Sequence, residues 1–376
     1  MNRNAFTPSD AVLSRREFLQ RASLTVAGVA AVAAFGPDAL EAAQSTGMRT
    51  LGRTGFKVTP ITFGGIQITE PRLLHVVIDK GINLIHTAPG YAGGRSIVAF
   101  GEVMKTRRKE VVLAVKVKPN QVDEALKTLN TDYIDIAVPD HNYYEAPFPP
   151  DELRAEYEAY KKAGKIRFTG FATHRQQATC IRNAVATGFF DVMLVAYNAT
   201  NREELLPLVR EARQKHNMGF MVMKATGGLQ KDPATRRLDP EAVSAALKNL
   251  MAGSEVDTVL LGMGTFQELD ANLKTMQNPR LTRRERQLLE QHLAVAAAGA
   301  CSLCGKCEVC PKGIPVAEVM RCQYYVARGD NALAREVYTS LPTTASACDN
   351  CGLCTRACPK RLNVATQVRR LHAALA

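Results

Sequence analysis

Eight cysteines near the C-terminus fall into two closely spaced runs. The second run is Cys348-Asp-Asn-Cys351-Gly-Leu-Cys354-Thr-Arg-Ala-Cys358-Pro359, and the first is Cys301-Ser-Leu-Cys304-Gly-Lys-Cys307-Glu-Val-Cys310-Pro311. Thiolates three residues apart can hold one iron–sulfur cubane, and a fourth cysteine followed by proline ligates a second cluster. We therefore predict two 4Fe–4S clusters, each taking three ligands from its own run and one from the other.

Structural zinc is the main alternative, because four-thiolate zinc sites also use C-x2-C pairs. Zinc gives no reason, however, for four cysteines in a row twice, with a Cys-Pro ending each time. Disulfides are disfavoured because cysteines three residues apart in a compact loop rarely reach bridging geometry. The second run matches the bacterial ferredoxin spacing, whereas the first is one residue shorter. Cys180 and Cys322 lie in helical stretches and are predicted to be buried packing residues.

The composition is that of a globular protein. Of 376 residues, 46% are hydrophobic and 22% are charged, which excludes a disordered chain or a protein with many membrane spans. The formal net charge is +12, which favours anionic membrane surfaces or an acidic partner. Because no basic run is present, the sequence gives no indication of nucleic-acid binding.

The N-terminal segment resembles an export signal. Adjacent Arg15 and Arg16 precede Phe-Leu, residues 22–37 carry no charge, and small residues follow at Ala42 and Ala43. Sixteen uncharged residues are too few for the roughly 20 of a membrane span, so none is predicted in the mature chain. We predict that residues 1–43 are a cleaved twin-arginine signal, a route that carries folded proteins to the periplasm with clusters already inserted. The alternative is an uncleaved amphipathic anchor.

Between the signal and the cysteines, short apolar runs alternate with helical periods. The expected strands are 60–65, 83–88, 110–117, 132–140, 167–174, 190–198, 219–226 and 256–262; the expected helices are 71–80, 95–107, 121–129, 150–163, 176–186, 202–215, 240–252 and 266–276. Eight such units predict an α/β fold, a (β/α)8 TIM barrel over 48–292 followed by a small, mostly helical dicluster domain over 295–376. The alternative, a Rossmann-type sheet, would want a Gly-x-Gly-x-x-Gly turn after the first strand, which is missing.

The active site of such a barrel lies at the carboxyl ends of its strands. Polar residues and glycines gather at these ends, which indicates acid–base chemistry at one mouth. They are Gly64, Gly65, His86, Tyr91, Lys116, Asp140, His141, Thr173, His174, Asn198, Lys224, Gly262 and Gly264.

With these residues in place, the chain resembles the aldo-keto reductase family through most of 48–276. The motifs are Leu51-Gly-Arg-Thr-Gly55, Gly81-Ile-Asn-Leu-Ile-His86-Thr-Ala-Pro-Gly-Tyr91, Val111-Val-Leu-Ala-Val-Lys116, Asp132-Tyr-Ile-Asp135, Met221-Val-Met-Lys224 and Leu261-Gly-Met-Gly264. The resemblance implies reduction of a small carbonyl substrate with a nicotinamide cofactor and a Tyr/Lys/Asp/His tetrad. It also identifies Tyr91 as the acid and Lys116 as the cation that stabilises its phenolate.

The other two tetrad positions depart from the family pattern. His86 stands where the family has Asp, and Asp140, with His141 beside it, stands where the family has His. The two residue types are exchanged, so Lys116 could still meet a carboxylate. We therefore include His86, Asp140 and His141 among the candidate catalytic residues.

The nucleotide positions also depart from the family. Its Ser-Asn pair reads Ala172-Thr173, its Gln corresponds to Leu194, and its usual basic residues for a 2′-phosphate fall on Gly262 and Glu268. These departures argue against NADPH, and leave NADH, a flavin or electrons from the clusters open. The candidate cofactor-binding residues are Gly64, Thr173, Asn198, Lys224, Gly262, Gly264 and Asn272.

The sequence thus predicts a periplasmic oxidoreductase in which a barrel active site is coupled to two clusters and to a redox partner protein. Arg356, Lys360 and Arg361 could dock an acidic electron carrier, or could form a solvated basic face. One alternative is a catalytically silent barrel that serves as an electron-transfer or assembly subunit. Another is a zinc-stabilised barrel that binds a sugar or peptide.

Overall fold

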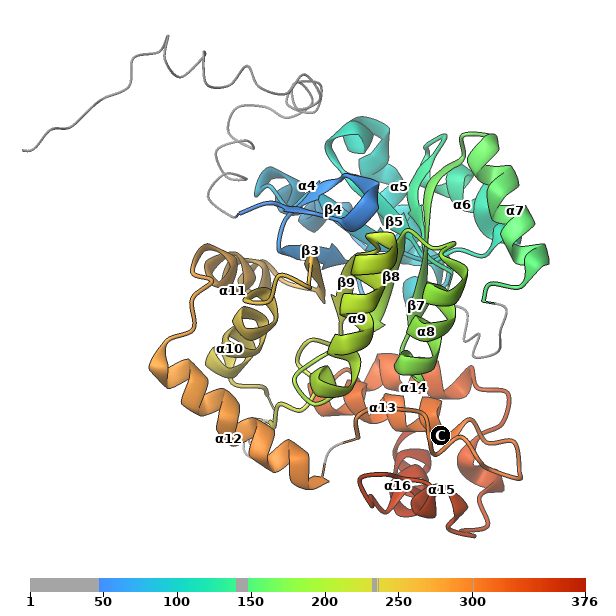
Figure 1. The fold of residues 1–376 in the computed structure, drawn as a ribbon, viewed down its shortest axis with the longest axis vertical. Coiled ribbons are helices and arrows are strands. Elements are labelled where there is room, and N and C mark those ends of the chain that lie inside the picture. Colours follow the sequence, from blue (N-terminus) through green and yellow to red (C-terminus); the bar gives the residue numbers. More distant parts are fainter. Residues whose placement is uncertain (1–46, 140–147, 232–234, 236, 300) are drawn as a thin grey trace, which may run out of the picture.

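The computed structural model describes residues 47–139, 148–231, 235, 237–299 and 301–376. Its centre is a closed parallel barrel in which eight described strands pair in the order β10-β3-β4-β5-β6-β7-β8-β9 (Figure 1). The strands are β3 (Ile61–Gly64), β4 (Leu84–Thr87), β5 (Val112–Val115), β6 (Ile134–Ala137), β7 (Ile166–Thr173), β8 (Val192–Ala196), β9 (Gly219–Met223) and β10 (Thr258–Gly262). The predicted barrel is confirmed, and because the sheet closes on itself the Rossmann-type alternative is wrong.

Alternating side chains divide the strands between two cores. Leu84, Ala114 and Ala172 belong to the cluster inside the barrel. Their neighbours Ile85, Leu113 and Phe171 belong to the cluster between barrel and helices. Because side chains in a strand alternate with a period of two, this parity fixes which residues at the carboxyl ends point inward.

Helices cover the outside of the barrel, each following its strand. They are α4 (Pro71–Asp79), α5 (Arg95–Arg107), α6 (Val122–Leu129), α7 (Asp151–Lys162), α8 (Gln177–Thr187), α9 (Arg202–His216), α10 (Pro240–Met251) and α11 (Phe266–Gln277). The short helices η2 (Tyr91–Gly94), η3 (Arg108–Glu110) and η4 (Pro119–Gln121) lie in the connections. Helix α12 (Arg283–Gly299) continues across the boundary expected between 292 and 295.

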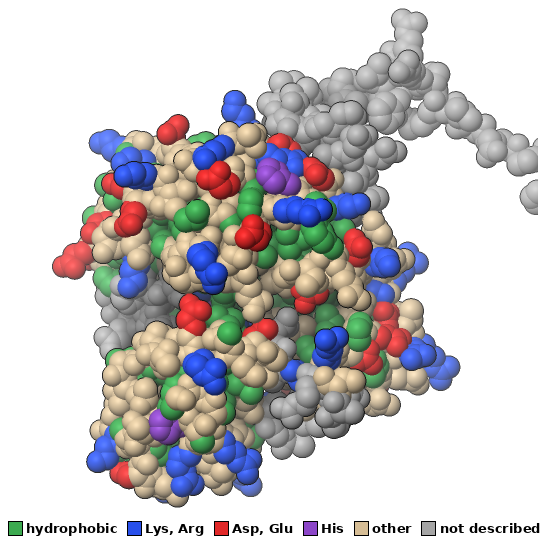
Figure 2. Space-filling view, turned by 180° about the vertical axis from the view of Figure 1, so that it is seen from behind, with side chains coloured by type: hydrophobic (Ala, Val, Ile, Leu, Met, Phe, Trp, Pro, Cys, Tyr) green, Lys and Arg blue, Asp and Glu red, His purple; other side chains and the backbone are tan. Residues whose placement is uncertain are grey.

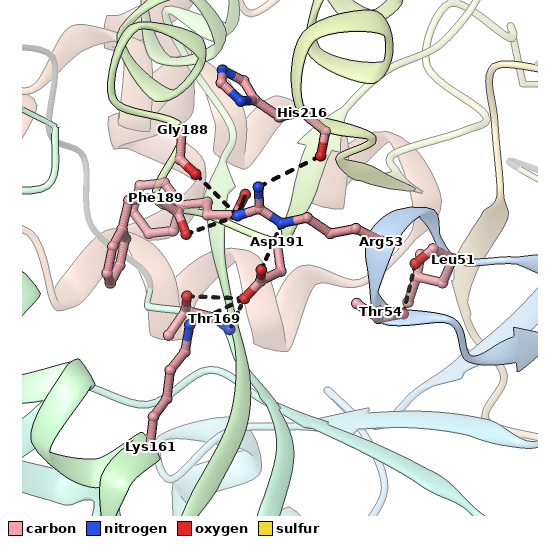
Figure 3. Close-up of polar contacts among 10 residues, drawn as sticks. Leu51, Arg53, Thr54, Lys161, Thr169, Gly188, Phe189, Asp191 and His216 are labelled. Atoms are coloured by element: carbon pink, nitrogen blue, oxygen red, sulfur yellow. Dashed lines mark hydrogen bonds and ion pairs between the residues drawn. The ribbon is translucent and has the colours of Figure 1, made fainter.

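A hairpin closes the amino ends of the strands. It consists of β1 (Arg49–Thr50), η1 (Gly52–Thr54) and β2 (Lys57–Val58). Arg53 fixes it to the barrel, since its Nε atom donates to Oδ1 of Asp191 at 2.7 Å and its Nη2 atom donates to the carbonyl of Gly188 at 3.0 Å (Figure 3). Oδ2 of Asp191 accepts from the backbone N–H of Thr169 at 3.0 Å and so ties this charge to β7. The hairpin is therefore part of the barrel.

The C-terminal residues form a small helical domain with its own core. Its elements are α13 (Val316–Arg328), α14 (Asn331–Thr339), η5 (Ala345–Ala347), α15 (Leu353–Arg356) and α16 (Val364–Leu375). Val319, Met320, Val368 and Leu375 are among its fully buried side chains. Figure 1 shows α13 and α14 against the barrel and α15 and α16 at the far side of this domain. Within the described residues, no helix combines the length and apolar character needed to cross a bilayer.

Candidate active site

A cavity of about 460 Å³ opens at the carboxyl ends of the barrel strands. Its barrel side includes His86, Tyr91, Lys116 and His174. Its other side comes from the C-terminal domain: Arg321, Tyr324 and Tyr325 of α13, with Asp330, Leu333, Glu336 and Val337 at and within α14. The volume lies in the lower part of the range for small-molecule sites. Both domains therefore line the cavity, and its size suits a small molecule.

Strand parity brings the predicted acid and its cationic neighbour together. His86 follows Leu84 by two residues and Lys116 follows Ala114 by two, so both point into the barrel mouth. Both are buried, with exposures of 1% and 7%. Tyr91 lies in η2, half-buried, and its ring centroid is 5.8 Å from that of His86. Three of the candidate catalytic residues thus line one cavity.

His174 completes this group, although only its place at a strand end pointed to it from sequence. It follows Ala172 on β7 by two residues and is 8% exposed. Its Nε2 atom lies 3.4 Å from Nζ of Lys116. Burial, followed by the charges of Lys116 and three other cations, holds its pKa well below the usual value for histidine. A neutral His174 can accept from the Lys116 ammonium, so it can orient that lysine.

Asp140 and His141 lie outside the residues that the structure describes. Their predicted roles, and the exchange of Asp and His between the two tetrad positions, stay predictions. Cys180 and Cys322 are fully buried in the described structure.

Lys224 joins the two domains at the cavity. It follows β9 and has a positive φ of 58°. Its Nζ atom lies 3.8 Å from the ring centroid of Tyr325 and 4.4 Å from that of Tyr324. Oγ1 of Thr226 lies within hydrogen-bond distance of the Tyr324 hydroxyl, at 3.0 Å. These cation–π and hydrogen-bond contacts hold α13 over the mouth of the barrel.

The predicted cofactor-binding residues divide into two groups. Gly64, Lys224 and Gly262 line the cavity. Thr173, Asn198, Gly264 and Asn272 lie outside the described residues that line it. The Thr173 hydroxyl donates to the carbonyl of Arg175 at 2.5 Å, and Oδ1 of Asn198 accepts from the Thr200 hydroxyl at 2.7 Å. These two side chains serve the connections that follow their strands.

The C-terminal domain also contacts the barrel beside the cavity. Arg175, after β7, pairs with Glu308 at 3.2 Å and with Glu318 at 3.4 Å. Gly305 lies so close to the barrel that an added Cβ atom would be 2.7 Å from Cγ of Gln176, and its φ is +76°. The first cysteine run therefore packs directly on the barrel rim.

The eight cysteines of the two runs line two separate cavities. The inner cavity contains Cys301, Cys304, Cys307 and Cys358, and the outer cavity contains Cys310, Cys348, Cys351 and Cys354. Each cavity thus takes three cysteines from one run and one from the other. No disulfide bond joins any two cysteines in the part of the chain that the structure describes. Among the described residues, no group of three or more His, Cys, Asp and Glu side chains is arranged to hold a single metal ion.

Burial raises the pKa of two of the four cysteines in the inner cavity. It raises the pKa of the Cys301 thiol to about 11 and that of Cys307 to about 12. Leaving water disfavours a bare thiolate, so these sulfur atoms are stable here as neutral thiols or as ligands of a cation.

The barrel has known relatives. Residues 67–248 match the aldo/keto reductase family. The chain is 25% identical over 296 residues to the uncharacterized oxidoreductase YqkF of Bacillus subtilis (strain 168), which spans 65% of this chain and 95% of that protein. It is 33% identical over 164 residues to the NADH-specific methylglyoxal reductase of Escherichia coli (strain K12), a match that spans 35% of this chain and 49% of that protein.

The fold also has solved counterparts. The holo form of aldo-keto reductase AKR11C1 from Bacillus halodurans has a TM-score of 0.55 and 23% identity, and the match covers 65% of this chain and 95% of that one. The family match over residues 67–248 and the relatives support an oxidoreductase whose barrel is similar to the aldo/keto reductases, and the solved structure shows the shared fold.

Proposed function

We propose that the chain is an exported oxidoreductase whose barrel cavity exchanges electrons with two 4Fe–4S clusters in the C-terminal domain. The shared helix α13 carries this proposal. Ala317 and Met320 line the inner sulfur cavity, and Arg321, Tyr324 and Tyr325 line the barrel cavity. About one helical turn, a rise of ~5.4 Å, therefore separates the two linings along α13. Such a short separation favours electron transfer between them.

The donor set in each cavity fits a 4Fe–4S cluster. Four thiols face each cavity, and aliphatic side chains fill most of the remaining lining: Leu303, Ala317, Met320, Leu362 and Val364 in the inner cavity, and Ile314, Val316, Leu353, Ala365 and Val368 in the outer one. Because each ligand of a cubane binds a different iron atom, four cysteines around a cavity suit it. Such clusters supply single electrons, at potentials tuned by burial and hydrogen bonds.

The barrel residues supply the proton chemistry for a carbonyl. Reduction of a carbonyl to an alcohol takes two electrons, which the clusters would supply one at a time, and two protons, one on the oxygen and one, which solvent would supply, on the carbon. Tyr91 would donate a proton to the carbonyl oxygen, and the Lys116 ammonium would stabilise the resulting phenolate. His174 would orient Lys116 through their 3.4 Å contact. Since α13 lies over the mouth of the barrel, it would partly shield a small substrate in this cavity from solvent.

The residues present fit NADPH poorly and offer a nicotinamide ring little polar contact. Leu194 is a cavity residue with no polar atom in its side chain, at the position where the resemblance expects Gln. Oε2 of Glu268 accepts from the backbone N–H of Gly264 at 2.7 Å, which places a carboxylate where a 2′-phosphate would need a cation. The rings of Tyr324 and Tyr325 lie against Lys224 of the barrel at this cavity. We therefore propose that the electrons reach the barrel through the C-terminal domain.

Metal analysis tests the clusters. Protein purified without oxygen should contain about eight iron atoms and eight acid-labile sulfide ions per chain. Cys304→Ser should lose about half of both, and Cys180→Ala, a buried cysteine outside both cavities, should keep all. Zinc without sulfide would contradict the proposal. Intact clusters that dithionite reduces, but that pass no electrons to any of a panel of small aldehydes and ketones, would instead favour an electron-transfer subunit.

Export needs its own test, because residues 1–43 lie outside the described part of the chain. Replacing Arg15 and Arg16 by lysine should leave the protein in the cytoplasm at its uncleaved length, whereas the native chain should be recovered from the periplasm. Equal recovery of both from the periplasm would contradict the twin-arginine route.

A further inference from the structure

The two sulfur cavities differ in their distance from solvent. The inner cavity lies against the barrel, where the Gly305 loop contacts Gln176 and where Glu308 pairs with Arg175. The outer cavity is lined in part by α15 and α16, and these two helices lie at the side of the domain away from the barrel in Figure 1. One of its cysteines, Cys351, is solvent-exposed. An external electron donor can therefore approach the outer cavity more closely than the inner one.

Two exposed aliphatic side chains flank the outer cavity. Within the described structure, four large hydrophobic side chains are exposed, and two of them are Val309 at 48% and Leu353 at 37%. Val309 precedes Cys310 and Leu353 precedes Cys354, and both of these cysteines line the outer cavity. An apolar contact at this point would bring a partner next to the sulfur ligands.

Basic side chains accompany these aliphatic residues. Nη1 of Arg356 donates to the carbonyl of Cys351 at 3.4 Å, and Arg356 is exposed. Lys312, half of whose side chain is exposed, lies 3.9 Å from Asp349. Residues 301–376 contain ten Lys and Arg against five Asp and Glu. Figure 2 shows the lower lobe, which is this domain, with more blue than red side chains on the visible face.

We propose that Val309, Lys312, Leu353 and Arg356, here called the docking face, bind a small acidic electron-carrier protein. This inference rests on the proposed function. The carrier gives up one electron and the outer site gains one, with no bond made or broken. Electrons then pass from the outer cavity to the inner cavity and along α13 to the barrel. The basic surroundings steer an acidic carrier, and the aliphatic pair allows close contact beside Cys351.

The composition of the docking face favours a protein over an anionic lipid surface. Lipid headgroups attract cations wherever they lie on a surface and need no apolar centre. Two aliphatic side chains flanked by two cations instead match the apolar centre and charged rim of a protein interface. A small patch also suits the weak, transient contacts of electron carriers.

Stopped-flow reduction of the iron-containing protein tests the docking face. The donor is a reduced plant-type ferredoxin, which is acidic, at an ionic strength of about 0.01 M, where the Debye length is about 30 Å. The second-order rate constant should fall about ten-fold in Val309→Glu, whose side chain lines neither sulfur cavity, and in the double variant Lys312→Glu/Arg356→Glu. The matched double variant Lys127→Glu/Lys274→Glu, on α6 and α11 of the barrel, should react as the native protein does. Added salt should slow the native protein and have little effect on the docking-face double variant.

Three further measurements separate the outcomes. Iron content and the rate with dithionite should be unchanged in the docking-face variants, which shows that the clusters remain intact. Ferredoxin rates equal to those of the barrel control would overturn the docking face alone. Tight sedimentation with phosphatidylglycerol vesicles, lost in the same variants and without any ferredoxin effect, would replace the protein carrier by a membrane surface. Absence of iron from the native protein would overturn the proposed function itself.

Discussion

Nζ of Lys116 lies 3.4 Å from Nε2 of His174, across the mouth of the barrel from β5 to β7. A lysine ammonium has only donors, so the Nε2 lone pair must accept and the proton of His174 must be on Nδ1. Burial and the nearby cations keep this histidine neutral by lowering its pKa. A neutral imidazole therefore holds the lysine on the side of β7.

The neutral state of His174 predicts a pH-dependent stability. Its folded-state pKa lies below the unfolded value of about 6.5, so the unfolded chain binds more protons in acid. Above pH 6.5 the histidine is neutral in both states and does not lower the free energy of unfolding. Below pH 6.5 the unfolded chain takes up a proton that the folded chain does not, so the free energy of unfolding falls by up to about 1.4 kcal/mol per pH unit. In urea unfolding, the free energy of unfolding should fall less between pH 7 and pH 5.5 in His174→Asn than in the native protein. His75→Gln, on α4, should retain the native slope, and an equal slope in all three proteins would contradict the expectation.

Tyr91 is expected to be the acid of the barrel. Tyr91→Phe removes the proton donor and keeps the ring, so turnover of small aldehydes should fall by about 10²–10⁴-fold. Reduced methyl viologen serves as the electron source, and alcohol formation is measured. Tyr160→Phe, a half-buried tyrosine on α7 outside the cavity, is the control. Equal activity of both variants would assign the proton to another group.

The predicted exchange of Asp and His can be tested at Asp140. If its carboxylate is the partner of Lys116, then Asp140→Ala should lower turnover about as much as Lys116→Ala. A neutral result for Asp140→Ala, together with a large loss for His174→Asn, would leave the histidine as the residue that orients Lys116. The pH profile of turnover separates this role from a structural one, because a misplaced lysine shifts the high-pH limb, which is set by loss of the proton from the acid Tyr91.

Neither NADH nor NADPH is expected to reduce the protein. Leu194 and Glu268 replace the groups that would hold the nucleotide, and the tyrosines of α13 lie at the cavity. Absorbance of the oxidised clusters should stay constant when either cofactor is added, and should decrease with dithionite. A saturable decrease with NADH or NADPH would show that the barrel accepts a nucleotide beneath α13.

The barrel could be predicted from sequence because its signals are local. Each strand is a short apolar run and each helix has its own period, so the predicted ranges agree with the structure. Lys116 and Tyr91 were found through their motifs. The sequence marks His174 only by its position at the end of a predicted strand. Its signal was parity, since Ala172 points inward and His174, two residues later, must do the same.

The shared wall of the cavity could not be predicted. Arg321, Tyr324 and Tyr325 are spaced to lie on one face of α13, which the sequence does reveal. Which surface that face covers depends on packing between segments about 100 residues apart, such as the contact of Thr226 with Tyr324. The distribution of the eight cysteines between two cavities can be predicted, because the spacing of each run limits how many thiols one loop can present to one cavity.

The hairpin that Arg53 anchors lies at the amino ends of the barrel strands, and α13 lies over the carboxyl ends. The full thickness of the barrel thus stands between residue 47 and Leu353. If the chain were held at a membrane by its amino-terminal segment, the C-terminal domain would face away from that membrane. Attachment at the amino end and the proposed electron transfer at the C-terminal domain are therefore compatible in one molecule.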